Sequence, residues 1–239
     1  MLTLIIAESA LETIPESLWT HPAITKWAKA HRKHPQHVLL DRSYHHAAMK
    51  KLEQSEKRGR PDIAHFALLE ALGSPLNREG LLTVYVHTFN DHMIWVNPEA
   101  RLPRNYSRFV SLIEQLFEFG KVPPNTAERP LLTLKKQTLP QLIKEIKPSY
   151  VLALSTIGKS QTLEASISNL PNKKNPVVLV GGFPKGHLSN ANLNLAHETL
   201  CIDHEMLETW TIVSRVIYEF ERALSLPSKR LETKAGEIS

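Results

Sequence analysis

The chain has 239 residues, 42% of them hydrophobic, and a formal net charge of +5. This composition excludes a disordered chain, and a single cysteine, Cys201, excludes an intramolecular disulfide and a thiolate metal cluster. No apolar run reaches the roughly 18 residues of a membrane span, and the N-terminal segment becomes acidic too early for a signal peptide. We therefore expect a cytoplasmic protein without membrane or metal partners, and its positive charge favours a polyanion as partner.

The first 53 residues predict two strands and a helix. Residues 2–7 form an apolar run that predicts a buried strand, and residues 38–40 predict a second, short strand. A polar run from Asp41 to His46 follows, where open α/β sheets place their sites. Asp41 or Ser43 either belongs to such a site or caps a helix expected over residues 47–53, and capping is slightly favoured.

A basic loop, KRGRPD, covers residues 57–62 and leads into a helix predicted over residues 62–72. Its cationic side chains, Arg58 and Arg60 among them, are suited to contact an RNA backbone. Asp62 has two interpretations. It either complements the dipole of the helix that it begins, or it pairs with Arg60 and holds the guanidinium as a rigid fork.

Residues 82–87 and 92–96 predict two strands of a β-hairpin. We then expect a helix from Pro103 to Gly120, with Arg104 and Arg108 four residues apart on one face and Arg101 just before its start. These arginines have no acidic partner at helical spacing, so a surface for phosphate is favoured over an exposed helix end with scattered charges.

The second half begins with a loop predicted over residues 121–136, followed by a helix over residues 138–146. A buried strand over residues 150–154 then leads into Ser155-Thr156-Ile157-Gly158-Lys159-Ser160. The last three residues resemble the end of a P-loop. The motif requires its first glycine where Ala153 stands, which disfavours a nucleoside-triphosphate site.

The run PVVLVGGFPKGHL, residues 176–188, predicts a strand that ends in a glycine-rich loop. That loop is either an ordinary turn or a place where the backbone approaches a ligand closely. One more strand is predicted over residues 198–202. Asp203 is expected to cap a helix over residues 204–224 whose apolar seam packs on the core or on a second copy, and residues 227–239 read as a polar tail.

Several motifs taken together resemble one family. They are LDRSYHH, KRGRPDI, NPEARLPRNYSRF, GKVP, LVGGFPKG and TLCIDHEMLETWTIVSRVIYEFE. In this order they resemble the ribosome-biogenesis pseudouridine N1-methyltransferases of the SPOUT (trefoil-knot) superfamily, over nearly the whole chain. RGRPD together with R-x-P-R-x-x-x-R is the specific part, and the short amino terminus is similar to the archaeal branch.

The resemblance implies an α/β fold in which one SPOUT-type domain, residues 1–239, has a mostly parallel sheet. It further implies a carboxyl-terminal deep trefoil knot, an inserted β-hairpin extension at residues 82–97 and a homodimer. The implied activity takes a methyl group from S-adenosylmethionine and places it on N1 of a pseudouridine in small-subunit ribosomal RNA, during biogenesis of that subunit.

The resemblance also assigns residues. RNA contacts fall on Arg58, Arg60, Arg101, Arg104 and Arg108, and the catalytic assignment falls on Asp62 and Arg60, with Asp62 holding Arg60 in place. The cofactor would be bound by three loops that contain Leu154, Ser155, Thr156, Gly181, Gly182, Phe183, Gly186, Cys201, Ile202, Leu207 and Thr209.

Two alternatives stay open at this point. The first is a non-catalytic RNA-binding factor of ribosome assembly, in which the arginines act and the glycine loop is only a turn. The second, less favoured, is a nucleoside-triphosphatase built on Gly158, Lys159 and Ser160.

Overall fold

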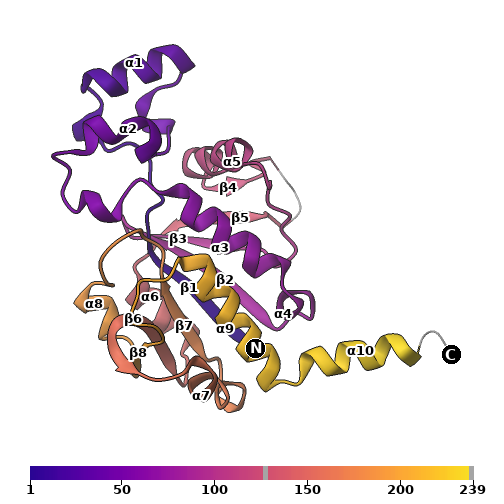
Figure 1. Cartoon of the computed structure of the whole chain (residues 1–239). Helices are drawn as coiled ribbons and strands as arrows, with labels where there is room; N and C mark the ends of the chain where they lie inside the picture. The colour runs from indigo at the N-terminus through magenta and orange to yellow at the C-terminus, as the bar shows by residue number, and fades with distance from the viewer. Residues whose placement is uncertain (126–128, 237–239) are drawn as a thin grey trace.

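The chain is described by a computed structural model that covers residues 1–125 and 129–236. An eight-stranded sheet, in the order β4-β5-β3-β2-β1-β7-β6-β8, forms its centre (Figure 1). Five neighbouring strands are parallel: β2 (Leu82–Thr88), β1 (Leu2–Ser9), β7 (Val177–Gly181), β6 (Val151–Ser160) and β8 (Glu198–Cys201). The antiparallel remainder consists of β3 (His92–Val96), β5 (Leu132–Lys136) and β4 (Lys121–Val122). The predicted α/β fold with a mostly parallel sheet is confirmed.

Strand β1 lies between β2 and β7, and all eight of its residues are buried. Successive side chains of a strand point to opposite faces of the sheet. Leu2, Leu4 and Ile6 accordingly belong to one hydrophobic cluster, and Ile5 and Ala7 belong to another. An apolar run without alternation is therefore buried on both sides, as the composition of residues 2–7 predicts.

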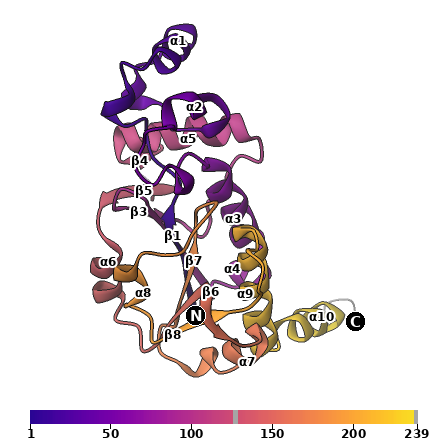
Figure 2. The same cartoon turned by 60° about the vertical axis from the view of Figure 1, so that its left-hand side comes forward.

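Helices cover both faces of the sheet (Figure 2). The larger cluster includes side chains of α3 (Pro61–Gly73), α4 (Pro75–Arg78), α5 (Tyr106–Phe119), α7 (Leu163–Ile167) and α9 (Thr209–Ala223). The other cluster includes side chains of α6 (Leu139–Ile146) and α8 (Asn190–Leu193). A last helix, α10, spans Leu226–Gly236. None of these helices, within the described ranges, is long and apolar enough to cross a bilayer.

A third, smaller core lies outside the two sheet layers. Helices α1 (Pro22–His31) and α2 (Arg42–Met49) pack around this core. Its buried side chains include Ile24, Leu40 and Met49. Figures 1 and 2 show α1 at one end of the molecule, beyond α2 and away from the sheet. We call residues 22–51 the α1–α2 module. The short 3-10 helices are Glu16–Leu18, Pro35–His37, Ser55–Lys57 and Leu170–Asn172.

Two predicted segments need correction. Residues 38–40 form no strand of the sheet, because Leu39 makes only an isolated bridge to Thr13 while Val38 and Leu40 fill the small core. Residues 121–136 contain β4 and β5 in addition to a loop, of which residues 126–128 lie outside the described ranges. The predicted capping by Asp41 is confirmed: its Oδ1 accepts from the Ser43 N–H at 2.8 Å, and the helix begins at Arg42 rather than at 47.

Helix starts and chain ends also differ from prediction. Helix α5 begins at Tyr106, three residues after Pro103, with Asn105 as its N-cap. Helix α9 begins at Thr209 rather than at 204, so Asp203 does not cap it. The predicted polar tail is helical to Gly236, and residues 237–239 lie outside the described ranges.

The predicted hairpin at residues 82–97 is present as β2 and β3. Its first strand also pairs with β1 in parallel, from Leu2 opposite Leu82 onward, so β2 is an inner strand of the sheet and the antiparallel extension continues through β3, β5 and β4. Strand order does not record how the chain threads through itself, so the trefoil knot stays a prediction.

Candidate active site

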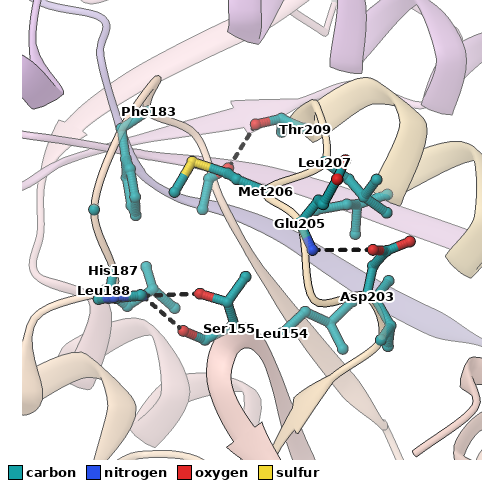
Figure 3. A pocket seen from close by; sticks show the side chains of 15 residues that line it. Leu154, Ser155, Phe183, His187, Leu188, Asp203, Glu205, Met206, Leu207 and Thr209 are labelled. Carbon is teal, nitrogen blue, oxygen red and sulfur yellow. Dashed lines mark hydrogen bonds between the residues drawn. The ribbon is translucent and has the colours of Figure 1, made fainter. Parts of the chain in front are cut away.

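A pocket lies where three adjacent parallel strands end. Strands β6, β7 and β8 run in the same direction, so the segments that follow them meet at one edge of the sheet, where open α/β sheets bind ligands. The walls come from the outer part of β6, from residues 181–188 and from residues 202–212 (Figure 3). The empty volume, which includes space open to solvent, is about 590 Å³.

Most residues predicted to bind a cofactor line this pocket. These are Leu154, Ser155, Thr156, Gly181, Phe183, Gly186, Ile202, Leu207 and Thr209. Two others, Gly182 and Cys201, do not line it. The structure therefore brings together one group of residues from all three predicted loops, and the pocket is the place where a cofactor contact by these residues can be tested.

Gly182 and Cys201 have packing roles instead. A Cβ at Gly182 would lie 2.7 Å from Cγ2 of Ile6 and 2.9 Å from Cα of Ser9, so only glycine allows the chain to pass this close to β1. Cys201 is 6% exposed, and its Sγ donates to the carbonyl oxygen of Asp203 at 3.1 Å.

An irregularity in β6 shapes one wall. Leu200 of β8 is opposite both Leu154 and Lys159, so the intervening residues 155–158 bulge out of the pairing. Gly158 lies directly against β8, where a Cβ would be 2.6 Å from the Leu200 backbone. Gly158, Lys159 and Ser160 thus belong to a paired strand rather than to a loop that wraps phosphate, and the triphosphatase alternative has no site here.

The second wall is tied to the third by a hydrogen bond. The Thr209 hydroxyl, at the first turn of α9, donates to the Gly181 carbonyl at the end of β7 at 2.7 Å. Gly186 has a φ of +93°, a conformation that L side chains rarely adopt. The loop after β7 therefore holds its shape through one backbone position reserved for glycine and one side-chain anchor.

The remaining lining residues are His187, Leu188, Asp203, Glu205, Met206 and Ile212, which the sequence analysis missed. Residues 203–206 were assigned to a helix, but they form a turn in which Asp203 Oδ1 accepts from the Glu205 N–H at 3.0 Å. Acidic residues directly after a buried parallel strand were the available signal for this turn.

A buried ion pair between Lys57 and Glu8 contacts the 181–188 loop. Lys57 Nζ lies 3.0 Å from Glu8 Oε2, with side chains 11% and 9% exposed. The same ammonium donates to the His187 carbonyl and lies 4.5 Å from the centroid of the Phe183 ring. A cation from the 57–60 segment thus holds two residues of the pocket wall.

Glu8 stays charged although it is buried. Burial raises the pKa of its carboxyl, but hydrogen bonds from Ser189 and Asn192, each at 2.7 Å to Oε1, together with the contact to Lys57, outweigh burial and lower the pKa. A buried charge is tolerated when every lone pair has a partner. The network therefore fixes the chain just after the pocket wall against β1.

A groove lies beside the glycine loop. Arg60 and Asp62 form a two-pronged pair, with Nε 2.8 Å from Oδ1 and Nη2 2.7 Å from Oδ2. The predicted pairing is confirmed. These hydrogen bonds raise the pKa of Arg60 against the opposing effect of burial, and the charge of Glu208 raises it further. Glu208 directly follows Leu207, a pocket residue, so the pair lies near the pocket mouth.

Two depressions share Arg42 and Arg60 and together form this groove. The first is also lined by Ser43, Asp62 and Tyr106, and the second by Glu56, Pro184 and Lys185. Pro184 and Lys185 lie between Phe183 and Gly186 of the pocket wall. The groove and the pocket are therefore both lined by the same short loop.

Tyr106 closes one end of the groove. Its hydroxyl donates to Asp41 Oδ2 at 2.5 Å. Burial, followed by this hydrogen bond, raises the pKa of Tyr106, so the phenol stays protonated and uncharged at neutral pH. The contact fixes the start of α5 to the start of α2.

Arg58 is not part of the groove, which corrects its predicted RNA contact. Only 7% of the residue is exposed, and its guanidinium binds Glu12 through Nε and Nη2, both at 2.6 Å. It also lies 4.7 Å from the centroid of the Phe89 ring. A cation that is already neutralised and enclosed has no surface left for a phosphate.

The other predicted RNA-binding arginines have the opposite setting. Arg101, Arg104 and Arg108 are all exposed, and none of them forms a salt bridge within the described ranges. Arg104 precedes α5, which corrects the prediction that it shares a helical face with Arg108. The three surround the start of α5, whose first residue, Tyr106, lines the groove.

The fold and the pocket define an α/β protein with a pocket at the carboxyl ends of parallel strands, beside a groove with a fixed arginine. A sequence model of one family, the EMG1/NEP1 methyltransferases, matches residues 4–221. The chain belongs to this family of methyltransferases, which confirms the predicted family and enzyme class.

Individual relatives agree. The chain is 46% identical over 226 residues to a "Ribosomal RNA small subunit methyltransferase Nep1" of Thermococcus kodakarensis, covering 95% of this chain and all of the relative. It is 47% identical over 220 residues to the protein of the same name from Pyrococcus furiosus, covering 92% and 96%.

A solved structure is also similar. The crystal structure of Archaeoglobus fulgidus Nep1 bound to S-adenosylhomocysteine superposes with a TM-score of 0.81 and 36% sequence identity, covering 93% of this chain and 98% of that one. That relative was crystallised with the product form of the methyl donor. This agrees with the cofactor predicted from the sequence.

Proposed function

We propose that this chain transfers the methyl group of S-adenosylmethionine to N1 of a pseudouridine in small-subunit ribosomal RNA. One observation carries the proposal: residues 183–186 line both a pocket and an arginine-lined groove. A methyl donor in the pocket and a nucleotide in the groove would then approach each other at this loop. The names of the relatives and the ligand of the crystallised one support the substrate and the cofactor.

The lining of the pocket fits the proposed cofactor. Apolar side chains such as Leu154, Ile202 and Leu207 suit the faces of an adenine ring, and backbone around Gly181 and Gly186 is open to close approach. Asp203 and Glu205 add carboxylates on one side. Those charges favour a cationic sulfonium over a neutral thioether, so they would favour the donor over its product.

The groove fits an unstacked nucleotide. Arg60 is held as a planar fork by Asp62, which fixes the direction of its remaining donors. RNA sequences are read where bases leave the stack, so we propose that the target base turns into the groove while Arg101, Arg104 and Arg108 hold the flanking phosphates.

Methyl transfer to N1 requires these residues to position the base and to accept a proton. When bound, S-adenosylmethionine supplies a methyl group whose bond to sulfur breaks as the new bond to N1 forms. The N1 proton has to leave, and we assign its departure to the Arg60–Asp62 pair, with Asp62 as acceptor and Arg60 stabilising the negative charge that develops on the base. Positioning of N1 in line with the methyl group accounts for much of the remaining rate.

The test is direct. Isothermal titration should show binding of S-adenosylhomocysteine and no binding of ATP. Incubation with a small-subunit ribosomal RNA fragment that contains pseudouridine should add one methyl group by mass spectrometry, whereas the same RNA with uridine should stay unmodified. RNA binding without cofactor binding would support the non-catalytic assembly factor instead.

We also propose that residues 1–239 act as one domain and that two copies form a homodimer through α3 and α9. These helices pack together, and Phe66 on α3 and Tyr218 on α9 are exposed, at 45% and 55%. The Phe66 ring meets Trp210 edge-on at 5.2 Å. Sedimentation should give a dimer that Phe66→Glu and Tyr218→Glu convert to a monomer; a monomeric wild type would contradict the proposal.

A further inference from the structure

The positive charge of the chain is concentrated in the α1–α2 module. Residues 22–51 contain seven Lys and Arg residues and a single acid, Asp41, so this segment has a formal charge of +6 while the whole chain has +5. The rest of the chain is therefore close to neutral. A charge imbalance of this kind within one module is the electrostatic footprint of a polyanion-binding surface.

The module presents its cations to solvent. Its exposed basic residues are Lys26, Lys29, Arg32, Lys33, Lys50 and Lys51. Its only acid is 6% exposed, caps α2 and accepts from Tyr106, so it does not offset the field at the surface. Of the exposed cations, Lys33 pairs with Glu114 of α5, which attaches the module to the rest of the fold.

Exposed aromatic groups accompany these cations. Tyr44 on α2 is 59% exposed, and its ring lies 6.4 Å from that of Trp27. The Trp27 ring stacks on the exposed His31 at 3.9 Å. Cations combined with aromatic faces are what single-stranded nucleic acid requires, whereas an acidic protein would not need stacking surfaces.

The module continues directly into the groove. Arg42 and Ser43, the first two residues of α2, line it together with Arg60 and Asp62, and Tyr44 is the next residue along the helix. The small hydrophobic core holds α1 and α2 together, so the charged surface is a rigid continuation of the proposed nucleotide site.

We propose that the α1–α2 module is a second RNA-binding surface, which holds the single-stranded segment that flanks the target nucleotide. This inference rests on the proposed function for the identity of the polyanion, and it goes beyond that function in adding a surface outside the pocket, the groove and the arginines of residues 101–108.

The test compares two sets of substitutions in the full chain. The module variant carries Lys26→Gln, Lys29→Gln and Lys50→Gln; the control carries Lys144→Gln, Lys147→Gln and Lys174→Gln, which remove the same charge from exposed positions on and beyond α6. The probes are a short stem-loop RNA with pseudouridine in its loop and the same stem-loop with extended single-stranded flanks.

We expect the module variant to bind the extended RNA roughly tenfold or more weakly and to lower the slope of log affinity against log salt by about two to three, as loss of three phosphate contacts predicts. The short stem-loop should lose much less, and the control variant should match the wild type with both RNAs. Equal affinities and slopes for the module and control variants would overturn the proposal.

Failure of the proposed function looks different. In that case the wild type itself would not methylate the RNA or bind S-adenosylhomocysteine, whatever the module variant does. Tyr44 supplies an independent measurement: Tyr44→Phe keeps the stacking ring and should bind the extended RNA as the wild type does, while Tyr44→Ala should lose about tenfold. Equal binding by both Tyr44 variants would remove stacking from the proposal.

Discussion

Two groups of cations in this protein have opposite surroundings. Lys57 and Arg58 are buried and bind Glu8 and Glu12 of the segment around the end of β1. The arginines at 101, 104 and 108 are exposed and have no salt bridge within the described ranges. The comparison shows that basic motifs of one chain differ in role: the cations at 57 and 58 stabilise the fold around the site, and those at 101, 104 and 108 stay exposed to a ligand.

Arg60 lies between these groups. Its side chain is 34% exposed and that of Asp62 is 26% exposed, so the pair is partly screened by water but still fixed in geometry. If the distinction is sound, the loss of unfolding free energy on substitution should follow burial, from Arg58 through Asp62 to the arginines of residues 101–108, while effects on RNA binding should run in the reverse direction.

The largest effect on stability is expected for Arg58→Met. Glu12, 1% exposed, would lose the guanidinium and retain the 2.8 Å hydrogen bond from Asn90, and removing one partner of a buried ion pair costs about 3–5 kcal/mol. Urea unfolding measures this loss. The double variant Arg58→Met with Glu12→Leu should recover much of it, and a loss no larger than that of a surface substitution would contradict the structural role.

A loss of stability of similar size, which depends on pH, is expected from the titration of His45 on α2. Burial lowers the pKa of this imidazole from 6.5 to about 4, against the opposing charge of Asp41 and with the aid of His31. The folded state therefore prefers the neutral ring. The contribution of neutral His45 to the free energy of unfolding is complete above pH 6.5 and is lost as the pH falls from 6.5 towards 4. The total loss is about 3 kcal/mol at most.

Unfolding in urea at several pH values tests this prediction. His45→Asn provides the control, because an amide oxygen can accept from the Asp41 N–H as Nδ1 does, at 3.0 Å, without titrating. The wild type should lose stability over this range more steeply than the variant. Parallel pH profiles would show that His45 is not the group responsible.

The resemblance to a known family located the pocket, and local patterns agree with it in part. Apolar runs predict the strands, and Gly181 and Gly186 mark a loop at the end of one of them. Polar residues after the strands at 154 and 201 mark the two neighbouring loops. Because β6, β7 and β8 are parallel neighbours, these loops meet at one edge of the sheet. The grouping of the three loops around one cofactor came from the resemblance, since local patterns alone favoured an ordinary turn after β7 and a helix from residue 204.

The parts that the sequence did not reveal depend on distant partners. Arg58 looks like an RNA ligand within its own loop, and only Glu12, far away in the chain, shows that it is buried. The role of Lys57 beneath His187 depends in the same way on a contact between separate segments. The turn at residues 203–208 was mistaken for helix because its apolar residues, Met206 and Leu207, continue the spacing of α9 while they line the pocket.

Asp62→Asn should have a much smaller effect on stability. A partly exposed pair contributes less than about 1 kcal/mol, and an amide can keep part of the contact with Arg60. Methylation should nevertheless fall by about 10²-fold or more, because the proton acceptor is lost and the fork is no longer held rigidly. Urea unfolding and single-turnover methylation with saturating RNA separate the two effects. Unchanged turnover would remove Asp62 from the chemistry.

The smallest effect on stability, and the largest on RNA affinity, is expected for Arg101→Ala combined with Arg104→Ala. Both side chains are exposed and precede α5, so their truncation should change the free energy of unfolding by no more than about 0.5 kcal/mol. Each lost phosphate contact should lower the salt slope of RNA binding by about 0.7. Affinity for S-adenosylhomocysteine should stay the same, since neither residue lines the pocket.

RNA binding measured across a salt series tests this prediction. If affinity and salt slope stay at wild-type values, exposure alone does not make a cation of this segment an RNA ligand. The distinction between buried and exposed cations then fails.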